Sequence, residues 1–255
     1  FGKNSEDVLN NLSLNVYEGE LLSIVGGNGA GKTTLLRLLS GIIRPYSGRV
    51  AYANPDLRLV YLPQNPQSMF AFETVLEDLL FVAGELGAGK RFLYSSGLSK
   101  VATENISPKL SAVIERLNIG NFLTRHPFDL SFGELQRAAL AMILLKQPRV
   151  ILLDEPTKGV DAHSKVGTAA LLKSLCVDGV AVVAVTHDIE FAAEYSDRCA
   201  MLFDGRIIDA GAPEQFFSGN ICYTTVAHRI AGSVFPHAVT CEEVINQWKD
   251  HATKQ

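Results

Sequence analysis

The sequence has few cysteines, no long hydrophobic run and no excess of positive charge. Its four cysteines lie about twenty residues apart without a CxxC pair, so neither a zinc site nor a disulfide framework is indicated, and a reducing cytosol fits. The longest apolar run, Ala138 to Leu145, is far shorter than the ~20 residues that cross a bilayer, and no signal-peptide pattern precedes it. If the protein acts at a membrane, we expect it to act as a peripheral protein that does not cross the bilayer.

Basic residues are slightly outnumbered, with 23 Lys and Arg against 27 Asp and Glu and a net charge of −4. No basic cluster provides the electrostatic footprint of a nucleic-acid-binding protein, so nucleic acid is not favoured as the main ligand. The 255 residues, of which 47% are hydrophobic, suffice for one large domain or two small ones. Because the chain opens at Phe1 without a methionine, we expect it to be a piece of a longer protein.

Short apolar runs rich in β-branched residues alternate with helical stretches along the chain. Such buried runs, separated by helices, predict a mainly parallel sheet in an α/β core. The predicted strands are 21–25, 57–62, 150–154, 180–187 and 199–203.

Two further regions lack this alternation. Residues 65–145 contain no strong strand run, and their amphipathic stretches at 74–86 and 110–117 predict a helical insertion. Within it, the glycine- and serine-rich stretch 84–100 is typical of a loop. Residues 221–255 are predicted to form a helical, peripheral tail after a main domain of 1–220.

The stretch GGNGAGKT, residues 26–33, matches the pattern of a phosphate-binding loop between a strand and a helix. Gly29 and Gly31 allow successive backbone N–H groups to face an anion, and the helix N-terminus adds partial positive charge. Lys32 can reach outer phosphates, and Thr33 can offer its hydroxyl to Mg²⁺. A glycine-rich turn without a ligand is the alternative, which the register of strand, Lys and Thr argues against.

The stretch RVILLDEP, residues 149–156, supplies an acidic pair at the end of a predicted strand. Asp154 can hold Mg²⁺ through water, and Glu155 can orient a water that attacks a γ-phosphate. A solvated turn is the alternative for such a pair taken alone.

Gln64 and His187 also follow predicted strands, and active sites of open α/β sheets gather at these strand ends. We therefore expect both residues to lie near the phosphate loop, although isolated His and Gln residues are more often structural.

The stretch DLSFGELQR, residues 129–137, has the pattern of a helix start. Ser131 can cap the helix while Glu134, three residues later, folds back onto the Ser131 amide in a capping box. The helix N-terminus that results is also suited to bind an anion.

The order of these motifs resembles the nucleotide-binding domain of an ABC transporter, over about Phe1 to Gly219. The resemblance implies a P-loop NTPase fold with a RecA-like core, an antiparallel β part and an inserted helical subdomain. The motifs that carry it are the phosphate loop 26–33, Gln64, LSFGE at 130–134, ILLDEP at 151–156, GVDA at 159–162 and THD at 186–188.

The resemblance also implies roles for individual residues. The expected catalytic residues are Glu155, His187 and Gln64. The expected ligands of Mg²⁺ are Thr33, Gln64 and Asp154. Contacts to ATP within the chain are expected from Asn28, Gly29, Ala30, Gly31, Lys32, Thr33 and Thr34, with Phe1 stacking on adenine.

In this family the LSFGE motif is called the signature, and the helix that starts in it is called the signature helix. This helix meets the ATP of a second subunit that is packed head-to-tail. The resemblance therefore implies that Ser131 and Gly133 contact the partner's γ-phosphate and that Asp161 crosses to that subunit. Two departures from the family pattern are Phe132 in place of the first signature glycine and Gly159-Val160 before Asp161.

Further stretches, including LPQNP, DEPTKGVDA and SGNICYTTVAHRI, are similar to ATPase subunits of energy-coupling factor importers, which supply vitamins or transition-metal ions. The closest likeness is to the C-terminal half of chains that fuse two ATPase domains. The implied function is ATP hydrolysis that powers transport from the cytoplasmic face of the cell membrane, with a second ATPase domain and membrane-embedded subunits as partners. Alternatives are a soluble ABC ATPase acting on DNA or the ribosome, a non-hydrolytic regulator, or another importer or exporter class.

Overall fold

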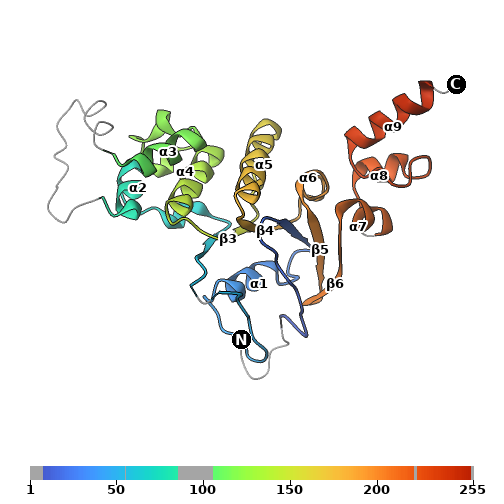
Figure 1. Cartoon of the computed structure of the whole chain (residues 1–255), viewed down its shortest axis with the longest axis horizontal. Helices are drawn as coiled ribbons and strands as arrows, with labels where there is room; N and C mark the ends of the chain where they lie inside the picture. Colours follow the sequence, from blue (N-terminus) through green and yellow to red (C-terminus); the bar gives the residue numbers. More distant parts are fainter. Residues whose placement is uncertain (1–7, 55, 86–105, 221–222, 254–255) are drawn as a thin grey trace. The chain divides into compact units, whose positions relative to one another are not determined.

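The computed structural model describes residues 8–54, 56–85, 106–220 and 223–253 (Figure 1). Its contacts divide the chain into two compact units. The first comprises Phe1–Tyr61 and Arg149–Gln255, and the second comprises Leu62–Pro148. Apart from Leu62, the last residue of one edge strand, the β-sheet belongs to the first unit, whereas the second unit is helical.

Within the described residues, strands form a single sheet in the order β2-β3-β4-β1-β5-β6. Strand β1 pairs in parallel with β4 and β5, and β3 pairs in parallel with β4, whereas β6 runs antiparallel to β5. The predicted α/β sheet, mainly parallel with an antiparallel part, is therefore confirmed. The strands are Leu21–Val25 (β1), Leu59–Leu62 (β2), Val150–Asp154 (β3), Ala181–Thr186 (β4), Arg198–Phe203 (β5) and Arg206–Gly211 (β6).

Strand β6 was not predicted from the sequence. Most of its residues are exposed and two, Arg206 and Asp209, are charged, so it lacks the long buried apolar run that marks the central strands. It pairs with β5 through a turn at Asp204 and Gly205, both of which have positive φ, at 47° and 70°. Asp-Gly between two strands is a strong hairpin signal, because L-residues other than Asn and Asp rarely adopt this conformation.

Alternate residues of the central strands face two separate hydrophobic clusters, as the period of two in a strand requires. Ala200 and Leu202 of β5 belong to the cluster that contains Leu35 and Leu36 of α1. Cys199 and Met201 belong instead to a cluster with Phe216 and Phe217. The sheet is therefore buried on both faces, which explains why its central strands are continuously apolar.

The helices of the first unit are α1 (Lys32–Leu39), α5 (Ala162–Val177), α6 (Ile189–Tyr195), α7 (Pro213–Gly219), α8 (Val226–Ala231) and α9 (Cys241–Thr253). Helix α1 packs on β3 and β4, while α5 packs on β4 and β1 and α6 on β1. In Figure 1, α1 is drawn on one side of the sheet and α5 and α6 on the other. Helices α8 and α9 pack together around Ala231, Phe235 and Ala238.

The second unit contains α2 (Val75–Ala83), α3 (Pro108–Leu117) and α4 (Phe132–Leu145), which pack against one another. Short 3-10 turns lie at Pro66–Met69, Gly120–Phe122 and Pro127–Asp129. Helix α2 ends at Gly84, whose φ of 76° stops the helix, and α3 starts at Pro108 because Ser107 caps it. Most of the predicted loop 84–100 lies outside the described residues. Among the described helices, none combines the length and apolar character that crossing a membrane requires.

Candidate functional site

The loop between β1 and α1 has the backbone that its glycines allow. Gly29 and Gly31 have φ values of 79° and 98°, a region that L side chains rarely adopt. Gly31 is the N-cap of α1, so the first free N–H groups of that helix lie at the end of the loop. At the start of the loop, a Cβ on Gly26 would lie 2.3 Å from the backbone oxygen of Leu202 in β5. The loop is therefore packed tightly on the sheet and ends at the free N–H groups of α1.

The clash at position 26 leads to a stability prediction. Gly26→Ala is expected to lower the free energy of unfolding by about 1–3 kcal/mol, because the loop must move away from β5 to admit a methyl group. Denaturant unfolding followed by circular dichroism measures this change. The control is Gly167→Ala on α5, where a Cβ meets nothing within 4 Å, and it should leave stability unchanged or slightly raised. Equal stability of Gly26→Ala and the native chain would contradict the tight packing.

The Lys32 side chain lies within the loop. Its Nζ donates hydrogen bonds to the carbonyl oxygens of Gly26 at 2.8 Å and Gly27 at 3.1 Å, and the residue is buried. A buried ammonium is stable only when hydrogen-bonded or paired with a negative charge. The loop thus holds a positive charge beside its N–H groups, as a site for a multiply charged anion requires.

Asp154, the last residue of β3, is buried beside two hydroxyl groups. The Tyr61 hydroxyl donates to Asp154 Oδ2 at 3.1 Å, and the Thr33 hydroxyl is also hydrogen-bonded to this carboxylate. Burial raises the pKa of Asp154, and these two hydrogen bonds offset only part of the rise. Burial and the Asp154 charge also raise the pKa of Tyr61 to about 12. The carboxylate therefore lies where an added cation would stabilise it.

Thr33 and Asp154 form a donor set that fits Mg²⁺. Both supply oxygen atoms, the ligand type that this ion prefers. Mg²⁺ usually binds through one or two protein oxygens together with waters and phosphate oxygens, so this small set suffices beside a phosphate loop.

Glu155 and His187 form a close pair at neighbouring strand ends. His187 Nδ1 lies 2.7 Å from Glu155 Oε2, and the His187 amide donates to the same oxygen at 3.3 Å. The Thr186 hydroxyl donates to it at 3.4 Å. Glu155 has a φ of 54°, a conformation uncommon outside glycine, and its amide donates to Val185 O at 2.9 Å. Contacts from three groups converge on Oε2 and restrain this carboxylate, and the strained backbone is typical of functional positions.

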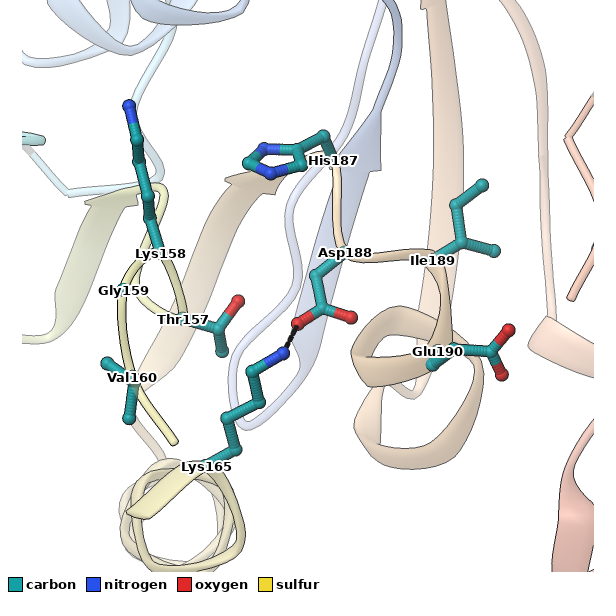
Figure 2. Close-up of a pocket in the computed structure, with 9 residues that line it drawn as sticks. All are labelled: Thr157, Lys158, Gly159, Val160, Lys165, His187, Asp188, Ile189 and Glu190. Carbon is teal, nitrogen blue, oxygen red and sulfur yellow. Dashed lines mark hydrogen bonds and ion pairs between the residues drawn. The ribbon is translucent and has the colours of Figure 1, made fainter. Parts of the chain in front are cut away.

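Beyond Glu155, a cavity of about 420 Å³ opens in the first unit (Figure 2). Asp161 follows the segment Thr157–Val160 on its wall and caps α5, accepting from Ser164 N at 3.0 Å and from Ser164 Oγ at 2.7 Å. The lining residues are Thr157, Lys158, Gly159, Val160, Lys165, His187, Asp188, Ile189 and Glu190.

The predicted capping box at Ser131 is confirmed in the second unit. Glu134 Oε2 accepts from Ser131 N and Ser131 Oγ, both at 2.8 Å, and Ser131 Oγ accepts from Glu134 N at 3.4 Å. The hydrogen bonds from Ser131 lower the pKa of Glu134, with a smaller contribution from Arg125 at 3.2 Å. Gly133 lies in the first turn of α4, and Gln64 is exposed after β2.

Three expected site residues belong to the second unit: Gln64, Ser131 and Gly133. The contacts described above for Lys32, Asp154, Glu155 and His187 all lie within the first unit. Phe1 lies outside the described residues.

A sequence profile described as "ABC transporter" matches residues 9–158, more than half of the chain. The chain belongs to the ABC transporter family. The matched segment includes the phosphate loop, Gln64, Ser131, Asp154 and Glu155. A solved nucleotide-free ATP-binding cassette of an ABC transporter superposes with a TM-score of 0.71, covering 88% of this chain and 92% of that chain at 24% identity. The fold is thus the ABC cassette form of the P-loop NTPases, a mostly parallel sheet with helical insertions.

Relatives of this ABC protein include longer chains. One from Bacillus thuringiensis subsp. konkukian, provisionally named an ABC transporter ATP-binding protein, is 37% identical over 96% of this chain and 43% of its own length. Another, YkoD of Bacillus subtilis, provisionally named an HMP/thiamine import ATP-binding protein, is 29% identical over 86% of this chain and 39% of its own. This chain therefore spans less than half the length of these two relatives.

Solved ABC structures include two informative cases. CbiO1 of Clostridium perfringens, described as part of the ABC transporter complex cbiONQ, is 26% identical with a TM-score of 0.70, covering 90% of this chain and 89% of that chain. A dimeric cassette described as a post-hydrolysis state bound to ADP and Pi is 27% identical with a TM-score of 0.66, covering 83% and 94%. The family therefore includes dimers that carry the products of ATP hydrolysis.

Sequence reasoning assigned no role to three residues of this ABC site. Tyr61 and Thr186 touch the acidic pair, and Lys165 lies on the cavity wall. For the first two a signal existed, since Tyr61 is the one polar residue within β2 and Thr186 is the polar last residue of the otherwise apolar β4. Lys165 gave no such signal, because a lysine on a helix is usually a solvated surface residue.

Proposed function

We propose that this chain is the ATP-binding and ATP-hydrolysing domain of an energy-coupling factor importer for a vitamin or a transition-metal ion. One observation carries the catalytic part of this proposal. Because β1, β3 and β4 are parallel, their carboxyl ends meet at one edge of the sheet, where the phosphate loop, Asp154 and the Glu155–His187 pair follow them. Ligands of open α/β sheets bind at this edge.

The phosphate loop is the proposed binding site for the ATP phosphates. Lys32 exchanges the carbonyl oxygens of Gly26 and Gly27 for phosphate oxygens, which are stronger acceptors because they are charged. Thr33 and Asp154 would hold Mg²⁺, which would neutralise charge on the phosphates. Tyr61 orients Asp154 through its hydrogen bond. Backbone N–H groups of Gly29, Ala30 and Gly31, together with Asn28 and Thr34, complete the proposed phosphate contacts.

Glu155 is the proposed catalytic carboxylate. Contacts from His187 and Thr186 fix its orientation, so it can accept a hydrogen bond from an attacking water without reorganising. His187 is the proposed contact to the γ-phosphate, and its ring is 59% exposed while Nδ1 stays on Glu155. Glu155 and His187 thus act as one unit that positions water against phosphate.

The remaining site residues are proposed to act with other chains. Ser131 and Gly133, at the N-terminus of α4, donate to the γ-phosphate bound by a second ATPase domain, and the helix dipole adds favourable potential. Asp161 is proposed to contact that second domain. Gln64 is proposed to contact both the Mg²⁺ site and a membrane-embedded subunit, and Phe1 is proposed to stack on adenine.

Three comparisons support the finer assignment. The name of YkoD mentions HMP/thiamine import, and CbiO1 is described as part of a transporter complex. The Bacillus thuringiensis relative is more than twice as long as the segment matched, which fits a chain that fuses two ATPase domains. We therefore propose that this chain is the C-terminal half of such a fusion and works at the cytoplasmic face of the cell membrane. A soluble ABC ATPase of DNA or the ribosome is the alternative, against which the absence of a basic cluster from the sequence argues.

This assignment predicts a slow, mostly monomeric ATPase when the chain is isolated. Its natural partner would be the other half of the fusion, so two copies of the chain would be imperfectly matched. Adding the other half should raise turnover steeply, because each phosphate loop then gains a signature helix that is already ordered. Covalent linkage should raise it further through an effective concentration of about 1 mM.

The measurement is the ATPase rate as a function of concentration, with the mass determined in parallel by sedimentation. A stable homodimer that hydrolyses ATP at full rate without a partner would contradict the proposal that this chain is one half of a fusion of two ATPase domains. It would leave the ATPase assignment itself intact.

A further inference from the structure

We propose that Lys165 is a positioning residue whose ion pair with Asp188 fixes the segment Gly159–Asp161 against the loop that carries His187. This inference rests on the proposed ATPase function and adds a residue to its machinery. Lys165 Nζ lies 2.5 Å from Asp188 Oδ2, and Figure 2 shows Lys165 extending from α5 to this carboxylate across the cavity. The pair joins two segments that approach each other only in the folded protein.

At one end of the pair, Lys165 is tied directly to Asp161. The Lys165 amide donates to Asp161 O at 3.0 Å, and the neighbouring Ser164 amide donates to Asp161 Oδ1 at 3.0 Å. Because these bonds lie in the first turn of α5, a displacement of Lys165 displaces the end of the segment Gly159–Asp161. The ion pair thereby restrains the position of that segment.

At the other end, Asp188 connects several elements. Its Oδ1 accepts from Phe191 N at 3.1 Å and so caps α6, and the Thr157 hydroxyl is hydrogen-bonded to the same carboxylate. Burial tends to raise the pKa of Asp188, but its bonds to Lys165 and Phe191 outweigh burial and the net pKa is lowered. The carboxylate is therefore ionised under ordinary conditions, as the ion pair requires.

Asp188 is also one step from the catalytic pair. Its amide donates to Thr186 Oγ1 at 3.0 Å, and that hydroxyl donates to Glu155 Oε2 at 3.4 Å. His187, between these two residues, contacts the same Glu155 oxygen at 2.7 Å through Nδ1. A shift of Asp188 would thus alter both groups that fix the Glu155 carboxylate.

The placement of this lysine has a local cost. A cation near the N-terminus of a helix meets the positive end of the helix dipole, so α5 alone would favour an acidic or neutral residue there. The pair is partly buried, with 34% of the Lys165 side chain and 15% of Asp188 exposed. At such a site the attraction is stronger than between fully exposed charges, which offsets the cost.

The test is a double-mutant cycle of Lys165→Met and Asp188→Asn in the ATPase assembled with its partner domain. The asparagine side chain can still cap α6, so Asp188→Asn removes the charge and keeps the helix start. Each single variant is expected to lower kcat by about tenfold, because misplacement of the water-positioning group slows the reaction without weakening ATP binding. KM for ATP should stay unchanged, the double variant should be no slower than either single one, and Lys165→Arg should recover most of the activity.

The control variant is Lys173→Met on the same helix, which breaks an exposed ion pair with Asp197 at 2.6 Å and should leave kcat unchanged. A second readout needs no ATP: hydrogen exchange of the His187 amide, bonded to Glu155 Oε2, should speed up in Lys165→Met but not in Lys173→Met.

Native kcat in Lys165→Met, or additive losses in the double variant, would overturn the positioning role. Failure of the proposed function looks different, because the native chain with its partner would then hydrolyse no ATP.

Discussion

Glu155→Gln is expected to slow ATP hydrolysis by at least about a hundredfold while ATP still binds. The amide keeps the size of the side chain and can still accept the hydrogen bonds that converge on Oε2. It loses the negative charge that orients and polarises water, so the loss falls on the chemical step. Steady-state ATPase assays with a competent partner measure kcat, and titration with ATP measures affinity.

The matched control for this variant is Glu214→Gln. Glu214 also pairs with a histidine, His237, at 3.3 Å, but both side chains are largely exposed on the surface. Of these two pairs, only Glu155–His187 lies at the edge of the sheet where the phosphate loop follows β1. Glu214→Gln should therefore hydrolyse ATP at the native rate. Turnover of Glu155→Gln close to native would remove Glu155 from the proposed catalytic role.

Lys32→Ala is expected to weaken binding of Mg-ATP to the single chain by roughly 10- to 100-fold. A charge-assisted hydrogen bond contributes about 1.5–3 kcal/mol, and each 1.4 kcal/mol is a tenfold change in affinity. The loss appears without a partner domain, because the loop and its lysine belong to one chain. Isothermal titration of the isolated chain with Mg-ATP measures it.

Ser131→Ala is the informative comparison for Lys32→Ala. Removing the cap should cost about 1 kcal/mol of stability, seen by denaturant unfolding, because Glu134 N loses its acceptor and the Glu134 carboxylate loses one of its donors. Its affinity for Mg-ATP in the isolated chain should equal that of the native protein. Equal losses of affinity in both variants would show that the signature helix binds the nucleotide of its own chain, which contradicts the two-domain arrangement.

Local features of the fold could be predicted from the sequence. The phosphate loop, the capping box at Ser131 and the central strands depend on residues within a few positions of one another, so pattern and spacing suffice. Strand β2 shows the limit of this reasoning, since it begins at Leu59 and not at residue 57. The Leu57 amide donates to Asn54 O at 3.1 Å, so this residue belongs to a turn. The apolar character of residues 57–62 gives no sign of this turn.

The family assignment also came from the sequence, because six ordered motifs specify it without any knowledge of strand order. Strand β6 was missed for a different reason: it gains its stability from pairing with β5, and its exposed residues leave no apolar signature. Its Asp204-Gly205 turn was the signal that could have revealed it.

Residue pattern and spacing were sufficient to identify which chemical groups this protein carries and which strand or helix end presents each of them. The tertiary structure alone decided which groups touch: His187 meets Glu155 across 32 positions, and Tyr61 meets Asp154 across 93. It also placed Lys165 on Asp188, across 23 positions. Contacts of this kind depend on the pairing order of strands, which long-range packing selects, and a local pattern holds no record of them.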